Sequence, residues 1–204
     1  MIPPKIPHNE IQRQLAVEKY GLLDTLPEDS YDNITSLISY ICETPISLVS
    51  LIDKNRNFLK AHHGVPMDES PREISFCGHA INSDEALIIV EDSRKDERFH
   101  DNPLVTEHNA IFYAGAQLID SDGYKLGTLC AFDTKPRRLS PDQKKALLSM
   151  AKQVINLFEL RFKNQELLKI SDHLKFRNEN LEKFASIISH DLRSPLSNII
   201  SLTE

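Results

Sequence analysis

Five apolar residues at strict seven-residue intervals constrain the C-terminal part of the chain more than any other feature. They are Leu160, Leu167, Leu174, Leu181 and Ile188. An apolar repeat of this period and length is typical of a helix that pairs with another helix in a coiled coil. If these residues occupy the d positions, the a positions include Asn164 and Asn178, and asparagine there favours a parallel two-stranded register. The other register would place Lys163 and Arg177 in the seam, so we prefer the first.

The start of this helix is marked by four consecutive residues. Ser140 can cap it, Pro141 suits a first turn, Asp142 suits the positive helix end, and Gln143 can close a capping box. A broad apolar face follows, which we expect to pack on the preceding domain. No element remains to cover the second half of the helix. A homodimer through it is therefore favoured over a long helix packed within a monomer.

Residues 1–139 alternate between two kinds of periodic pattern. Helical spacing predicts a first helix over 10–23, with Ile11, Leu15 and Val17 on its apolar face, and a second helix that starts near Pro27 and ends before Pro45. Strand patterns cover 46–52, 57–62, 87–90, 111–119 and 124–133, and the first and last of these form hairpins with their neighbours. This order predicts an α+β fold, a mainly antiparallel sheet with helices on one face or end.

The composition limits which cellular compartment and which classes of binding partner are expected. The chain has 204 residues and a net charge of -6, which argues against nucleic acid or an anionic membrane surface as partner. No apolar run approaches the roughly 18 residues of a membrane-spanning helix, and no signal region opens the chain. Three cysteines without paired spacing fit reduced thiols. We therefore expect a cytoplasmic protein.

The stretch 184–196 combines a helical apolar face with a histidine that lies off that face. The imidazole of His190 is a usable nucleophile near neutral pH. Asp191 can accept the proton of the other ring nitrogen and so orient the ring. Pro195 crowds the carbonyl of Asp191 and should kink the helix just past the histidine.

The order Ser-His-acid-Leu-Arg-Ser-Pro-Leu in this stretch resembles the phospho-acceptor box of sensor histidine kinases. The resemblance implies that His190 accepts a phosphoryl group from ATP and passes it to an aspartate of a response regulator. It gives Asp191 the role of proton acceptor and Ser194 a role in phosphatase activity. Such kinases bind ATP and magnesium in a separate domain. No Gly-rich nucleotide box occurs in these 204 residues, so we expect this chain alone to be inactive.

The middle of the chain carries a second resemblance. The segments 72–81, 96–99, 102–105, 112–115 and 127–133, in this order, resemble a bacterial subfamily of GAF domains found in front of histidine kinases and cyclic-dinucleotide enzymes. Gln117 and Ile111 stand where that subfamily usually has proline and often has arginine. We divide the chain into a GAF-like sensory domain (1–139), a signalling coiled-coil helix (140–183) and the start of a phospho-acceptor domain (184–204).

GAF domains hold small ligands between the sheet and its covering loops, and the segment 62–101 is the expected cover. The resemblance makes Phe76, Cys77, His79, Tyr113 and Gln117 the candidate ligand residues. Cyclic nucleotides, tetrapyrroles, haem, an unknown small molecule and a purely structural role all remain open. No pair of residues has established metal-ligand spacing, so we predict no metal. Within the cover, Arg72, Glu73, Asp96 and Arg98 are expected to form one internal ion-pair set.

Two other functions compete with the kinase. One is a ligand-binding or dimerisation module without phosphotransfer. The other is a redox or metal sensor that uses Cys77 and His79. The kinase interpretation rests on the complete box around His190, because a lone His-Asp pair is more often an ordinary feature of a helix surface.

Overall fold

The computed structural model describes the backbone of residues 1–201 and the side chains of residues 1–186 and of Ile188. The chain divides into two compact units, residues 1–160 and 161–204. The first unit is built on one six-stranded sheet with the strand order β3-β2-β1-β6-β5-β4, in which every neighbouring pair is antiparallel. The predicted α+β fold is therefore confirmed.

The strands are β1 (Ile46–Ile52), β2 (Arg56–His63), β3 (Glu69–Pro71), β4 (Leu87–Val90), β5 (Phe112–Ile119) and β6 (Lys125–Asp133). The helices are α1 (Glu10–Lys19), α2 (Asp29–Cys42), α3 (Phe76–Ala80), α4 (Pro103–Thr106) and α5 (Pro141–Ser201), with short 3-10 turns at Arg72–Ile74 and Ser93–Lys95. The elements expected from apolar periodicity are all present. The short β3, α3 and α4 and the two 3-10 turns were not predicted as elements.

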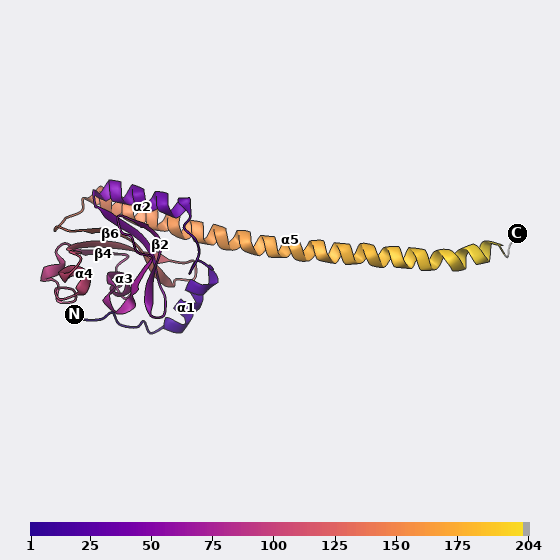
Figure 1. Cartoon of the computed structure of the whole chain (residues 1–204), viewed down its shortest axis with the longest axis horizontal. Coiled ribbons are helices and arrows are strands. Elements are labelled where there is room, and N and C mark those ends of the chain that lie inside the picture. The colour runs from indigo at the N-terminus through magenta and orange to yellow at the C-terminus, as the bar shows by residue number, and fades with distance from the viewer. Residues whose placement is uncertain (202–204) are drawn as a thin grey trace. The chain divides into compact units, whose positions relative to one another are not determined.

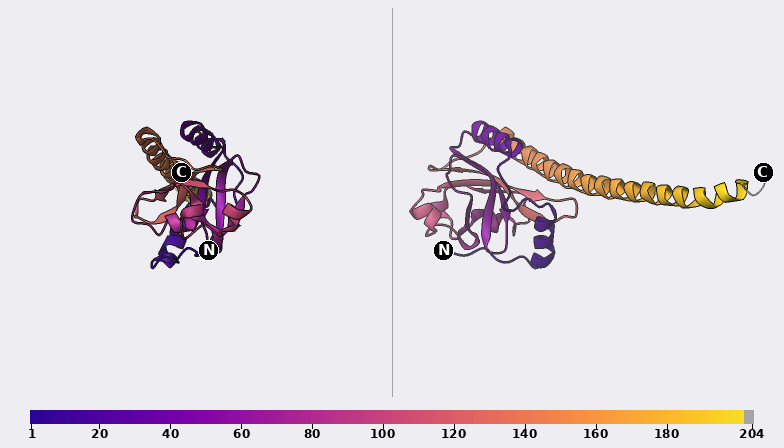
Figure 2. Two further views of the ribbon diagram at one scale, coloured as in Figure 1. Left: turned by 90° about the vertical axis from the view of Figure 1, so that its left-hand side faces the viewer. Right: turned by 45° about the vertical axis from the view of Figure 1, so that its right-hand side comes forward.

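Two helical layers enclose the sheet of the first unit. The helix α2 and the first turns of α5 run side by side over one face, and α3 and α4 lie against the other face (Figures 1 and 2). On the α5 side, Leu147, Ala151, Val154 and Phe158 are buried, as expected for the apolar face of this helix. The ring of Phe158 packs against Tyr31, with the ring centres 5.5 Å apart.

The start of α5 forms the predicted capping box. The backbone N–H of Gln143 donates to Ser140 Oγ at 3.2 Å, and the backbone N–H of Ser140 donates to Gln143 Oε1 at 2.9 Å. The amide of Gln143 also donates to the carbonyl of Ile41 at 2.9 Å. The cap therefore satisfies the free helix end and ties α5 to the end of α2.

The buried face of α1 differs from the prediction. Ile11 and Leu15 are 74% and 61% exposed, whereas Arg13 and Gln14 are buried. Gln14 donates to Asp53 in the β1–β2 turn at 2.6 Å. Val17 is buried as predicted, so α1 is placed both by part of its apolar face and by polar contacts to a turn. The buried side chains of Arg13 and Gln14 are tolerated there because they have hydrogen-bond partners.

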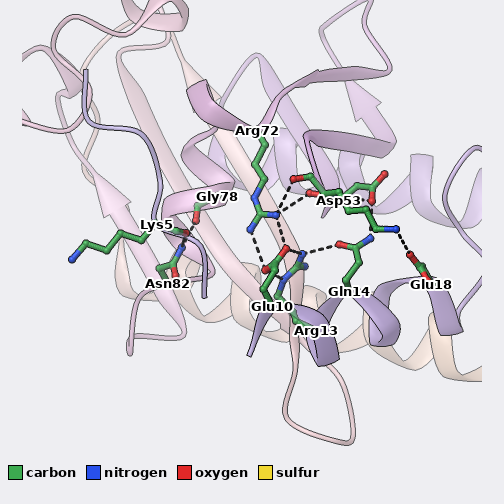
Figure 3. A network of polar contacts seen from close by, with 10 residues as sticks. Lys5, Glu10, Arg13, Gln14, Glu18, Asp53, Arg72, Gly78 and Asn82 are labelled. Atoms are coloured by element: carbon green, nitrogen blue, oxygen red, sulfur yellow. Dashed lines mark hydrogen bonds and ion pairs between the residues drawn. The ribbon is translucent and has the colours of Figure 1, made fainter. Parts of the chain in front are cut away.

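A network of charges joins α1 to the cover of the sheet (Figure 3). Arg72 donates to Glu10 at 2.5 Å and to the carbonyls of Asp53 and Lys54. Asp96 and Arg98 instead form a separate pair, with 2.6 Å between Oδ2 and Nη2. The expectation of one ion-pair set that includes Arg72, Asp96 and Arg98 is therefore wrong.

The second unit contains the remainder of α5. Its seven-residue repeat is exposed: Leu167, Leu174, Leu181 and Ile188 are between 40% and 62% accessible. Within the described side chains, this apolar row has no cover from the rest of the chain.

Candidate functional site

An apolar cavity of about 230 Å³ lies between the sheet and the cover that α3 and α4 form. Its walls come from β1, β2, β6, α3, and the segments 65–70 and 104–110. The apolar lining consists of Ile46, Leu48, Leu59, Val65, Pro66, Met67, Phe76, Leu104, Ala110 and Phe132. The lining residues Pro66, His108, Asn109 and Thr134 are exposed, so the cavity reaches the surface there. A small, largely apolar molecule is the class of ligand that suits such walls.

Side-chain hydrogen bonds hold the cover in place. Ser75 caps α3 by accepting from the backbone N–H of Gly78 at 3.1 Å. Asn102 accepts from the backbone N–H of Leu104 at 2.8 Å and donates to the carbonyl of Ile74 at 2.9 Å. Asn102 thereby joins the start of α4 to the turn before α3, and the shape of the cavity depends on this connection.

Two of the predicted ligand residues, Phe76 and Cys77, line this cavity. Both lie on α3, and Phe76 is fixed in orientation because its ring stacks on Phe99 with the centres 3.9 Å apart. Tyr113 lies in the same core, 5.3 Å from the ring of Phe76, but it does not belong to the lining. Its hydroxyl occupies the space that a Cβ on Gly115 would fill, so Gly115 is required for this position.

Gln117 and His79 position the cover rather than line the cavity. Gln117 donates to the carbonyls of Ala80 and Ser83 at 2.7 and 2.8 Å, which satisfies the last turn of α3. His79 Nε2 lies 2.9 Å from the carbonyl oxygen of Ile2. Burial lowers the pKa of His79, so the ring is neutral at pH 7. Ligand contact by these two residues stays a prediction.

Asn57 is a lining residue that the sequence analysis missed. It is buried, and its side-chain oxygen has no hydrogen-bond partner among the described residues. An unpaired buried acceptor is costly, and a donor on a bound molecule would satisfy it. Its place on a predicted strand was the only signal in the sequence, and it does not distinguish Asn57 from the other polar residues of β2.

Metal binding finds no support in the described part of the chain, where no three His, Cys, Asp or Glu side chains cluster as ligands. His62 instead lies 3.3 Å from Asp68, and His63 lies 3.5 Å from Ser36. Neither histidine lines the cavity beside Cys77.

The predicted phospho-acceptor residues stand in the second unit. The backbone of His190, Asp191 and Ser194 is helical and belongs to α5, as expected for the box. Their side chains lie outside the described ones. Across residues 1–201, none of the helices combines the length and the apolar character needed to cross a bilayer.

Comparison with known proteins decides the family of the first unit. The GAF domain family matches residues 26–157. The chain belongs to the GAF domain family. Over 138 residues it is 37% identical to a cyclic di-GMP phosphodiesterase of Pseudomonas aeruginosa, and this match covers 67% of the chain but 23% of that protein. The chain therefore spans less than a quarter of this curated relative.

Solved structures share the GAF fold at low identity. The GAF domain of an Acinetobacter phosphoenolpyruvate-protein phosphotransferase has a TM-score of 0.55 at 16% identity, covering 75% of this chain and 94% of that one. A domain described as part of a two-component sensor histidine kinase from Sinorhizobium meliloti has a TM-score of 0.52 at 14% identity, covering 70% and 96%. The PixJ GAF domain of Thermosynechococcus elongatus has a TM-score of 0.55 at 12% identity, covering 83% and 99%. At these identities the likeness shows the fold alone.

Proposed function

We propose that this chain is the sensory and dimerisation part of a two-component sensor histidine kinase, with His190 as the phospho-acceptor. The observation that carries the proposal is the box at 184–196, which stands in α5, a helix that begins with a capping box at the end of the GAF unit. The exposed seven-residue repeat of α5 supports pairing of two copies ahead of the box.

The chemistry assigned to the box is one phosphoryl transfer. A ring nitrogen of His190 attacks the γ-phosphorus of ATP, an N–P bond forms, and the bond to the ADP oxygen breaks. Asp191 holds the proton of the other ring nitrogen and so stabilises the developing positive charge. The phosphoryl group then passes to an aspartate of a response regulator. ATP and magnesium would be bound by a separate domain, with the ion offsetting the phosphate charge.

We propose that the cavity of the GAF unit binds the small molecule that is sensed. A small molecule in the cavity would contact α3 and β6, while α2 and the first part of α5 cover the opposite face of the sheet, with Phe158 of α5 packed on Tyr31 of α2. A ligand changes an equilibrium only if it binds the two arrangements with different affinity. Contacts that differ between two arrangements of the sheet and α5 would provide that difference.

The alternative is a ligand-binding or dimerisation module without phosphotransfer. One observation favours it specifically: the relative with 37% identity is a cyclic di-GMP phosphodiesterase. A similar GAF domain therefore also occurs in a protein with a different activity. The presence of the domain does not identify the activity of the protein that contains it.

The test is incorporation of labelled phosphate from ATP into the protein as its gene encodes it. We expect acid-labile, alkali-stable label that His190→Gln abolishes. His173→Gln is the matched control, because His173 is an exposed histidine of the same helix, and it should keep the label. Label that persists in His190→Gln would exclude His190 as the acceptor. A folded dimer without any label would favour the binding module.

A further inference from the structure

Two cysteines from distant parts of the chain meet beneath α3. The Sγ atoms of Cys77 on α3 and Cys130 on β6 are 3.8 Å apart, and both side chains are buried. A disulfide has an S–S bond of about 2.05 Å, so an approach of less than 2 Å would join them. The third cysteine, Cys42, lies on α2, on the opposite face of the sheet.

Only one of the two thiols borders the cavity. Cys77 is part of its lining, whereas Cys130 is not. Since the rim of the cavity is exposed at Pro66, His108 and Thr134, a small polar oxidant can reach Cys77 without unfolding of the domain. Cys130 would then act from within the core as the resolving thiol.

The pair lies in the buried apolar core of the domain, but two hydroxyl groups are close to it. The hydroxyls of Ser50 and Thr128 lie 3.1 Å apart on the neighbouring strands. Hydrogen bonds from the Cys130 thiol and from Ser50 and Thr128 lower the pKa of Cys77, whereas burial raises the pKa of Cys130. Cys77 is also the thiol that borders the cavity, so it is the one that an entering peroxide meets first, and its thiolate is the nucleophile that peroxides oxidise.

We propose that Cys77 and Cys130 form an oxidisable dithiol site, in which a hydroperoxide entering the cavity converts the two thiols into an intramolecular disulfide. The Cys77 thiolate attacks one peroxide oxygen, the O–O bond breaks, and a sulfenic acid and one molecule of alcohol or water result. The Cys130 thiol then attacks the Cys77 sulfur and displaces water. Two thiols lose two electrons, and the hydroperoxide gains them.

The new bond would act on the ligand cavity. It joins α3, which carries the lining residues Phe76 and Cys77, to the β6 strand that forms another wall. Oxidation would therefore change the position of α3 and the shape of the cavity. This inference does not depend on phosphotransfer, so the two proposals can fail separately.

The test treats the reduced, folded chain with hydrogen peroxide, then denatures and alkylates it. We expect alkylated cysteines to fall from three to one, with Cys42 the residue still modified. After digestion with trypsin, the disulfide should hold peptides 73–94 and 126–137 together as one linked product. Reduction with dithiothreitol should separate the two peptides. Full retention of three thiols, under conditions that oxidise the urea-unfolded chain, would overturn the proposal. So would disulfides between chains or with Cys42.

Variants test separately the oxidation of Cys77, the formation of the disulfide, and the entry of the oxidant through the cavity. Cys130→Ala should stop at a dimedone-reactive sulfenic acid on Cys77, and Cys42→Ala should form the disulfide as the unchanged chain does. Ala110→Trp fills part of the cavity and should slow oxidation. Oxidation of Cys130 in a folded Cys77→Ala chain would contradict the order of attack, and an unchanged rate in Ala110→Trp would contradict entry through the cavity.

Discussion

Glu10 connects the first helix to the cover of the sheet through two arginines. Its carboxylate accepts from Arg13 at 2.8 Å and from Arg72 at 2.5 Å. Burial alone would raise the pKa of Glu10, but the hydrogen bonds and charges of Arg13 and Arg72 outweigh it and lower the pKa to about 2. The folded state therefore binds a proton at this site less readily than the unfolded chain, and folding is linked to pH.

We expect Glu10→Gln to destabilise the protein at pH 7 by roughly 1–3 kcal/mol, the usual cost of breaking a charged hydrogen-bond pair. The sign follows from the lowered pKa: the stabilisation is complete above the ordinary pKa of 4.5 and is lost as the pH falls towards about 2. Urea unfolding at several pH values measures the difference between the two proteins. A difference that stays constant from pH 7 to pH 3 would contradict the assignment.

Single residues also show where sequence patterns mislead. Ile11 and Leu15 carry the helical apolar spacing of α1, yet the structure buries Arg13 instead. Periodicity counts apolar residues and does not detect that a charge has partners elsewhere in the chain. The partners of Arg13 include Gln14, which in turn donates to Asp53 in the β1–β2 turn. A contact across 39 positions leaves no local signal.

At the scale of elements, the start of α5 was predictable because its signals are local. Ser140 and Gln143 satisfy each other's backbone N–H groups. Ser140→Ala should cost about 1 kcal/mol in the free energy of unfolding. Ser149→Ala is the control, because Ser149 is exposed within the same helix and alanine favours a helix interior. Equal effects of the two substitutions, in thermal or urea unfolding, would show that the cap contributes nothing.

The short elements of the cover were not predictable for the opposite reason. α3 has five residues, too few for a helix to be stable by itself. It forms because Ser75 caps its start and Gln117, on a strand distant in sequence, satisfies its end. The long strands and α2 carry enough periodic residues to be found from sequence. The cavity, which the short elements enclose, could be anticipated only from the family resemblance.

At the scale of the whole molecule, the exposed apolar row of α5 favours pairing of two copies of the chain. The GAF unit has its own core, whereas the row of Leu167, Leu174 and Leu181 in the second unit is more than half exposed. Burying a leucine side chain contributes about 1.5–3 kcal/mol, so a row of them contributes enough to pair two helices. The polar a positions Asn164 and Asn178 would reduce this gain while specifying the register.

We therefore expect the chain to be a dimer at micromolar concentration and Leu174→Glu to dissociate it. Two leucines are lost per dimer, so the expected cost is at least about 3 kcal/mol, which weakens association by more than about 100-fold. Phe176→Glu is the matched control: it also replaces an exposed apolar residue by glutamate, but at an outward position two residues along the same helix. Sedimentation velocity would distinguish monomer from dimer in all three proteins. If the unsubstituted protein is a monomer, the proposed coiled-coil interface is wrong. Equal dissociation in both variants would also contradict it, because an effect that does not depend on helical position cannot arise from a coiled-coil register.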